Sequence, residues 1–139
     1  MTLRVEVTDS ADADDVARIG AELAAFNNAD VGPSEKVALT VLVRDDRGDL
    51  AAGLSGYTAW GWLYVQWLWV SEGLRGQGIA ARMLDEAEAA ARARGCHGAW
   101  IDTFSPTALR SYQRQGYAVF GELPDFPAGR RRSFLKKAL

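Results

Sequence analysis

The sequence has almost none of the residue types from which disulfides and metal centres are built. Among its 139 residues there is one cysteine, Cys96, and one histidine, His97. A single cysteine excludes an intramolecular disulfide and a multi-cysteine metal site, and a single histidine excludes multi-histidine ligation. We therefore expect no metal cofactor.

Long apolar runs and a dominant charge sign are also missing. No segment approaches the run of about 18 apolar residues that a transmembrane helix needs, and residues 1–10 lack the basic and apolar regions of a signal peptide. Sixteen basic and eighteen acidic side chains give a net charge of −2, which gives no reason to expect binding to nucleic acid or to an anionic membrane. We expect a cytoplasmic protein with neither partner.

The charges are unevenly distributed along the chain. Residues 1–49 carry eleven acids and five bases, whereas residues 50–139 carry seven acids and eleven bases. The basic surplus ends in the clusters at 130–132 and 136–137. These clusters are either solvated strand ends or a surface that faces an anionic ligand, and the sequence leaves both interpretations open.

Length and hydrophobic pattern predict one mixed α/β domain over residues 1–139. Hydrophobic residues make up 48% of the chain and charged residues 24%, as in ordinary globular domains. Residues 62–70 are nearly all large and apolar, which is typical of a central strand buried on both faces. Gly53 and Gly56 mark possible bulges or close approaches in the preceding strand. The apolar periodicity predicts strands at 3–7, 37–43, 50–60, 62–70, 99–104, 117–120 and 133–135, and helices that end near 28 and span 79–94 and 107–115.

The segment from Val70 to Ala80, VSEGLRGQGIA, is the most informative part of the sequence. It joins the predicted central strand to an amphipathic helix and contains Gly73, Gly76 and Gly78, which permit a tight turn and close approach of a ligand to the backbone. The free N–H groups and dipole of a helix N-terminus bind phosphate or pyrophosphate; a plain strand-to-helix turn is the alternative. The Lys-Ser/Thr pair of a Walker loop and the spacing of a dinucleotide fingerprint are both absent.

Two segments together resemble one known family. Arg75-Gly76-Gln77-Gly78-Ile79-Ala80 is similar to the acyl-CoA pyrophosphate loop of the GNAT superfamily of N-acetyltransferases, Gln/Arg-x-x-Gly-x-Gly/Ala. Residues 108–117 resemble the late helix of that family, with a tyrosine ahead of a Gly-aromatic pair. Trp-Gly-Trp-Leu at 60–63, Asp-Thr-Phe-Ser at 102–105 and Gly-Tyr-Ala-Val-Phe-Gly at 116–121 look like its short bacterial members. The resemblance implies a GNAT-like fold with a central mixed sheet of six to seven strands flanked by helices.

The resemblance also implies a role for individual residues. Tyr112 would be the general acid beside the CoA sulfur, and Ser105 stands where many relatives have an asparagine that touches the pantetheine. The acetyl carbonyl and the pantetheine arm would be held in a splay between the predicted strands at 62–70 and 99–104. The backbone groups that would bind them are those of Leu68, Trp69 and Val70. The N–H groups that would bind the pyrophosphate are those of Arg75, Gly76, Gln77, Gly78, Ile79 and Ala80.

The implied reaction is transfer of an acetyl group from acetyl-CoA to a primary amine, of a small molecule or a peptide, by direct attack in a ternary complex. A tyrosine with a pKa near 10 stays protonated at neutral pH and can donate to a leaving thiolate. No base is evident: Glu22, Glu72 and Asp102 are candidates that equally suit capping or pairing, and a water-mediated route is open. The alternative function is a non-catalytic acyl-CoA-binding or sensing module. The apolar and aromatic late strands favour a homodimer.

Overall fold

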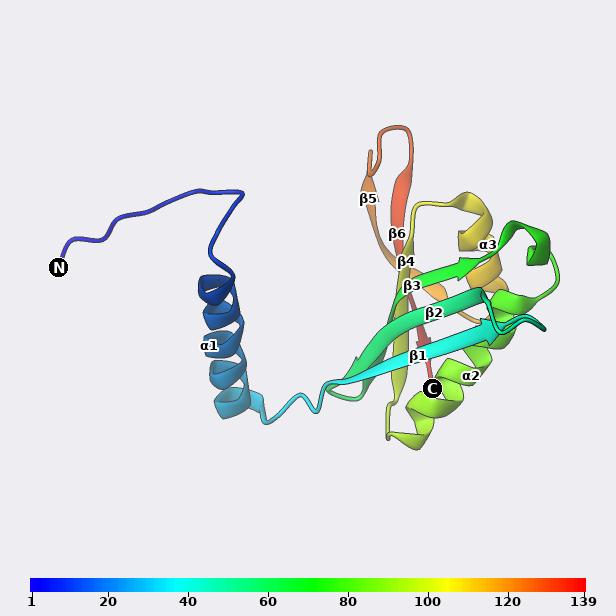
Figure 1. The fold of residues 1–139 in the computed structure, drawn as a ribbon, viewed down its shortest axis with the longest axis horizontal. Helices are drawn as coiled ribbons and strands as arrows, with labels where there is room; N and C mark the ends of the chain where they lie inside the picture. Colours follow the sequence, from blue (N-terminus) through cyan, green and yellow to red (C-terminus); the bar gives the residue numbers. More distant parts are fainter. The chain divides into compact units, whose positions relative to one another are not determined.

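The computed structural model describes Met1 to Leu139 as two compact units, residues 1–34 and 35–139. The first unit contains one helix, α1 (Ala13–Val31, blue in Figure 1), whose N-terminus is capped by Asp12 through a hydrogen bond from the Asp14 N–H group (2.9 Å). The helix extends three residues beyond the predicted end at Asn28. The predicted strand at 3–7 is wrong: this segment forms no β ladder and is not one of the six strands of the sheet.

The second unit is built on a six-stranded sheet in the order β1-β2-β3-β4-β6-β5 (Figure 1). The first three strands and the last two pair antiparallel, whereas β3 and β4 are parallel and are connected by a helix. The predicted mixed sheet flanked by helices is therefore confirmed. Its elements are β1 (Val37–Arg44), β2 (Leu50–Ala59), β3 (Trp62–Val70), η1 (Glu72–Leu74), α2 (Ile79–Ala93), β4 (Gly98–Thr103), α3 (Pro106–Arg114), β5 (Ala118–Pro124) and β6 (Arg131–Ala138).

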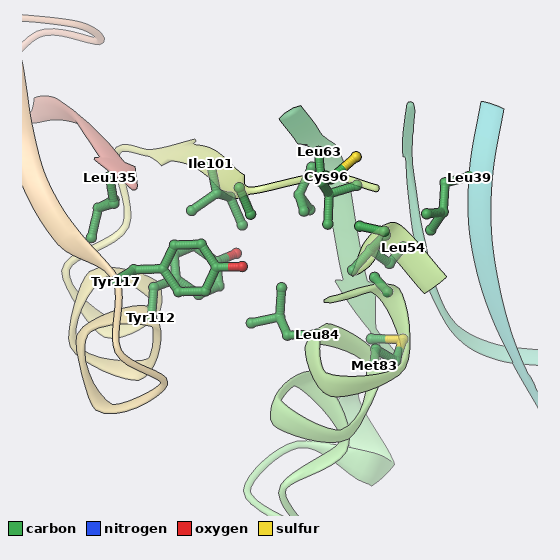
Figure 2. Close-up of a cluster of buried hydrophobic side chains, with 14 of the residues drawn as sticks. Leu39, Leu54, Leu63, Met83, Leu84, Cys96, Ile101, Tyr112, Tyr117 and Leu135 are labelled. Atoms are coloured by element: carbon green, nitrogen blue, oxygen red, sulfur yellow. The ribbon is translucent and has the colours of Figure 1, made fainter. Parts of the chain in front are cut away.

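One face of the sheet packs with α2 and α3 to form the hydrophobic core, part of which Figure 2 shows. Along β3, Leu63 and Val65 are buried, whereas Trp67 and Trp69, beyond an irregularity in the strand, are 68% and 48% exposed. The prediction that this strand is buried on both faces is wrong, because its aromatic side chains lie on the face that the core does not cover. The largest apolar side chains that are fully buried in the core belong to Leu54, Leu63, Met83, Leu84, Ile101 and Leu135.

An extra residue in β3 creates the feature that positions the candidate site. The register between β2 and β3 changes from Ser55 opposite Trp67 to Gly56 opposite Val65, so Gln66 forms a bulge. A Cβ atom on Gly56 would overlap the carbonyl oxygen of Tyr64, which confirms the predicted close approach at this glycine. The parallel ladder between β3 and β4 covers only 62–65 with 98–101 and stops at the bulge. Beyond that point, one edge of β3 is left without a strand partner.

Candidate active site

A cleft of about 670 Å³ lies beside the unpaired end of β3. Its walls come from that strand, from the loop that follows it, from the first turn of α2 and from α3. The structure thus brings together segments that are more than twenty residues apart in the sequence. Nine of the eleven predicted site residues line it: Leu68, Val70, Arg75, Gly76, Gly78, Ile79, Ala80, Ser105 and Tyr112. Trp69 and Gln77 do not.

The loop before α2 exposes a row of backbone N–H groups. Gly76 and Gly78 have φ angles of 77° and 76°, in the left-handed region that side chains with a Cβ atom rarely adopt. Gly78 is the N-cap residue of α2, and no side chain caps this helix. The N–H groups from Gly76 to Ala81 have no backbone acceptor. Since such groups and the helix dipole attract negative charge, this end of the cleft is suited to an anion.

The side chains around these N–H groups add positive charge and stiffen the loop. The Nε atom of Arg75 donates to the carbonyl oxygen of Val70 (3.1 Å), and Nε2 of Gln77 donates to that of Gly73 (3.2 Å). Gln77 therefore braces the loop from outside the cleft. Arg75 and Arg114 are the basic residues of the lining, which contains no carboxylate. Sequence reasoning missed Arg114, for which the only available signal was its position two residues after Tyr112.

Helix α3 places Tyr112 in the cleft. The helix starts at Pro106 because the Ser105 hydroxyl caps it, accepting a hydrogen bond from the Ala108 N–H group (3.3 Å). Tyr112 is only 6% exposed, and this burial, with a smaller contribution from the charge of Asp102, raises the pKa of its hydroxyl to about 12. The hydroxyl makes no hydrogen bond within the protein. At neutral pH it is therefore a protonated donor that is free to bind a ligand.

The three candidate bases have other positions or partners. Asp102 is the first residue of β4 beyond the ladder with β3: its Oδ1 accepts from the Tyr64 hydroxyl (3.2 Å) and its Oδ2 from Nε of Arg132 (2.7 Å). Glu72 begins η1 and does not line the cleft. Glu22 belongs to α1, in the first unit. The geometry favours the pairing interpretation for Asp102 and assigns no base.

Two further observations concern metals and membranes. His, Cys, Asp and Glu side chains do not gather in any group of three that could hold a metal ion. None of the helices combines the length and apolar character needed to cross a bilayer.

Comparison with known proteins gives consistent results. Residues 10–117 match the model of the acetyltransferase (GNAT) family. An acetyltransferase of Agrobacterium fabrum (strain C58) is 46% identical over 131 residues, which are 94% of this chain and 96% of that protein. Blasticidin-S acetyltransferase of Streptomyces morookaense is 43% identical over 95 residues, 68% of this chain and 70% of that protein. The crystal structure of an Agrobacterium tumefaciens protein assigned as an acetyltransferase is 44% identical, covers 99% of this chain and 100% of its own, and gives a TM-score of 0.93.

Proposed function

The chain belongs to the GNAT acetyltransferase family, and from this premise we propose that it transfers an acetyl group from acetyl-CoA to a primary amine by direct attack in a ternary complex. One observation carries the proposal: unpaired backbone N–H groups at one end of a cleft and the unpaired hydroxyl of Tyr112 within the same cleft. The first feature suits a diphosphate and the second suits a leaving thiolate.

The pyrophosphate of the cosubstrate would bind the N–H groups from Gly76 to Ala80, whereas the N–H group of Arg75, which was also predicted to bind it, already donates to the carbonyl oxygen of Glu72 (3.3 Å). The guanidinium groups of Arg75 and Arg114 line the same cleft and add attraction for its negative charge. Gly76 and Gly78 are needed because the loop is left-handed at both positions, and an L side chain would strain it. The two glycines would therefore have a conformational role in binding.

The pantetheine arm and the acetyl carbonyl would bind the free edge of β3. Beyond Val65 this edge has no strand partner, so the backbone groups of Leu68, Trp69 and Val70 that point away from β2 would be available to them, although the Val70 carbonyl oxygen already accepts from Nε of Arg75. Trp69 would contribute through its backbone, since its side chain does not line the cleft. Ser105 would contact the arm from the opposite wall with the part of its hydroxyl that capping leaves available.

Tyr112 would act as the general acid. The amine nitrogen attacks the thioester carbon, and a backbone N–H group facing the carbonyl oxygen stabilises the negative charge that develops there, a contribution of about 3 kcal/mol per donor. When the carbon–sulfur bond breaks, the sulfur takes the proton of the Tyr112 hydroxyl. The nitrogen, which became positively charged on attack, would lose a proton through water, and that proton restores the Tyr112 hydroxyl. A pKa of about 12 keeps that proton in place at neutral pH. Because no carboxylate lines the cleft, the amine would arrive neutral or lose its proton to water.

The amine acceptor is proposed to be a small molecule or a peptide. The name of the Streptomyces relative, blasticidin-S acetyltransferase, supports the small-molecule class. We place the protein in the cytoplasm and expect it to work as a homodimer. We also propose that residues 1–139 act together as one functional domain.

Acetyl-CoA should raise the melting temperature of the protein, and Gly78→Glu should abolish this increase by placing a negative charge against the phosphates. The matched control is Gly48→Glu, at another left-handed glycine with open space around it, in the β1–β2 turn. This control should lower the melting temperature of the free protein similarly yet keep the response to acetyl-CoA. Equal melting curves with and without acetyl-CoA in the unmodified protein would contradict the assignment of the loop.

A second candidate, a non-catalytic acyl-CoA-binding or sensing module, is favoured by the lack of a carboxylate in the cleft. Both functions predict the response to acetyl-CoA, so only turnover distinguishes them. Release of free CoA should be measured with polyamines, aminoglycosides, amino acids and peptides. Release with any of them supports the enzyme, and its absence with all of them supports the module.

A further inference from the structure

Three consecutive arginines stand where β6 extends beyond its ladder with β4, and their partners differ. Arg131 pairs with Glu122 of β5 (3.3 Å), and Arg132 pairs with Asp102 of β4 (2.6 Å). Arg130 forms no ion pair, and its only hydrogen bond is to a carbonyl oxygen. The cluster therefore contains one guanidinium group whose charge is not compensated by a carboxylate.

The side chains of Arg130 and Arg132 both lie against Phe104. Nη1 of Arg130 donates to the Phe104 carbonyl oxygen (3.3 Å), and the guanidinium carbon of Arg132 is 5.8 Å from the centre of the Phe104 ring. The same guanidinium carbon is 4.8 Å from the centre of the Phe126 ring. Both rings are 46% exposed. These two guanidinium groups and two rings form one surface, which we call the arginine site.

Arg132 is held in place, yet only part of its guanidinium group is used. Its Nε and Nη2 atoms both contact Oδ2 of Asp102 (2.7 and 2.6 Å), and Oδ1 of that carboxylate accepts from the Tyr64 hydroxyl (3.2 Å). The Tyr64 ring stacks on that of Trp100, with ring centres 3.9 Å apart. Nη1 of Arg132 makes no hydrogen bond within the protein, and the side chain is 30% exposed. A guanidinium group fixed in this way binds an anion at a low cost in side-chain entropy.

The arginine site lies next to the candidate active site. Asp102 is the first residue of β4 beyond the ladder with β3, where the free edge of β3 begins. Phe104 directly precedes Ser105, which lines the cleft. The charge of Asp102 also contributes to the raised pKa of Tyr112, so the two side chains are within electrostatic range of each other. A molecule whose amine reaches a thioester at the free edge of β3 would have its remaining atoms close to the two arginines.

The charge balance favours a carboxylate as the group that binds there. The carboxylates of Asp102 and Glu122 are each paired with an arginine. The other carboxylate of the hairpin, Asp125, accepts from the Gly129 N–H group (3.4 Å) and forms no ion pair. The single charge of Arg130 matches the single charge of a carboxylate, and a planar guanidinium group can donate to both of its oxygens.

We propose, on the basis of the proposed acetyl transfer, that Arg130 and Arg132 bind a carboxylate group of the amine acceptor. Arg130 supplies the uncompensated charge, and Arg132 adds a donor through Nη1. The rings of Phe104 and Phe126 contact the carbon atoms beside that carboxylate. The acceptor is then an amine that also carries a carboxylate, as amino acids do.

Turnover of matched amines that differ only in this group tests the proposal. The probes are γ-aminobutyrate, δ-aminovalerate and ε-aminocaproate, which differ in the span between amine and carboxylate, each paired with its own amide. In at least one pair, kcat/KM should be about tenfold higher for the acid than for the amide, mainly through KM. Arg130→Gln should bring this ratio close to one, and Arg130→Lys, which keeps the charge, should retain part of it. Equal values of kcat/KM for acids and amides in the unmodified protein would overturn the proposal.

Arg131→Gln is the matched control, because it removes an arginine of the same cluster whose partner is Glu122. It should keep the ratio of the unmodified protein. Arg132→Lys keeps a cation beside Asp102 and should lower the ratio less than Arg130→Gln does. An unchanged ratio in Arg132→Lys would exclude Arg132 from the site. If Arg131→Gln lowered the ratio as much as Arg130→Gln, only the overall charge would matter and the arginine site would be refuted.

Calorimetric titration of the same probes into protein saturated with CoA separates this inference from the proposed function, because CoA has no acetyl group to transfer. The preferred acid should bind about tenfold more tightly than its amide, and Arg130→Gln should remove the difference. This binding pattern without turnover would support the arginine site and contradict acetyl transfer. Turnover of acids and amides with equal kcat/KM would have the opposite meaning. Failure of every acid to bind measurably would also refute the site.

Discussion

Tyr112 and Tyr117 are five residues apart in the sequence, but the polar groups around them differ: those near Tyr117 are hydrogen-bonded to one another, whereas those near Tyr112 are not. Their ring centres are 6.5 Å apart, both are buried, and burial raises the pKa of both (Figure 2). The Tyr117 hydroxyl donates to Oε2 of Glu88 (3.0 Å), whereas that of Tyr112 has no partner in the protein and lies in the cleft. The comparison shows that burial alone does not distinguish a structural hydroxyl from one available for chemistry.

The region around Tyr117 is fully paired. Glu88, 2% exposed in the middle of α2, lies 2.6 Å from Nζ of Lys137 and accepts from Tyr117 as well. These contacts connect α2 to β6 and to the segment after α3. The N-terminal end of the same helix is unpaired, with N–H groups that lack acceptors. One helix therefore contributes stability through one half and, in the proposed function, binding through the other.

The largest difference between the two tyrosines should appear in catalysis. Tyr112→Phe should lower kcat about 100- to 10,000-fold, the usual contribution of a general acid. Its affinity for CoA and its free energy of unfolding should change little, because no hydrogen bond within the protein is lost. Steady-state kinetics with CoA titration and urea denaturation measure these quantities.

Tyr117→Phe is the matched control for this substitution. It removes the same hydroxyl from a neighbouring ring, yet should keep kcat while the free energy of unfolding falls by about 1–3 kcal/mol, since Glu88 loses a donor. Turnover at the unmodified rate in Tyr112→Phe would remove this residue from the acid role. Equal effects of both substitutions on kcat would abolish the distinction between the regions.

Glu88→Ala should produce the next largest effect, on stability. It leaves the Lys137 ammonium half-buried without its carboxylate, and breaking a buried pair costs about 3–5 kcal/mol. Combined replacement with Glu88→Met and Lys137→Met should recover much of this loss, because no uncompensated charge remains. Urea denaturation of the three proteins provides the comparison. A loss below about 1 kcal/mol in the single variant would contradict the structural role assigned to the pair.

Much of the paired region and the cleft could be predicted from sequence because both depend on local patterns. The apolar period of residues 79–94 predicts one face formed by Ile79, Met83, Leu84, Ala87 and Ala91, and in α2 all of these except the partly buried Ile79 are buried. The glycines before it predicted a loop with free N–H groups, which the structure has. Such features depend on residues that are close to one another in the sequence, so the sequence alone is enough to predict them.

The remaining features depend on contacts between distant segments. Nothing local indicates that Glu88, on an apolar helical face, meets Lys137 about fifty residues later. The alternation at 3–7 describes only a segment able to form a strand, and a strand also needs a partner. The aromatic run at 62–70 predicted a strand that is buried on both faces. One face is exposed in the structure, and a local pattern cannot predict this because burial depends on whether other segments cover that face of the sheet.

The smallest expected effect is a loss of stability at high pH, which again compares Tyr112 with Tyr117. Both tyrosines have a pKa above the ordinary value of 10 in the folded protein, so the unfolded chain loses these protons first. Stability is then unaffected below about pH 10 and falls as the pH rises further. For Tyr112, with a pKa of about 12, the loss reaches about 1.4 kcal/mol by about pH 11. Urea denaturation from about pH 8 to about pH 11 should show a shallower decline for Tyr112→Phe than for the unmodified protein. Because the hydroxyl keeps its proton throughout the lower part of that range, deprotonation of Tyr112 should not reduce kcat below about pH 10, and an alkaline fall that Tyr112→Phe removes would contradict the raised pKa.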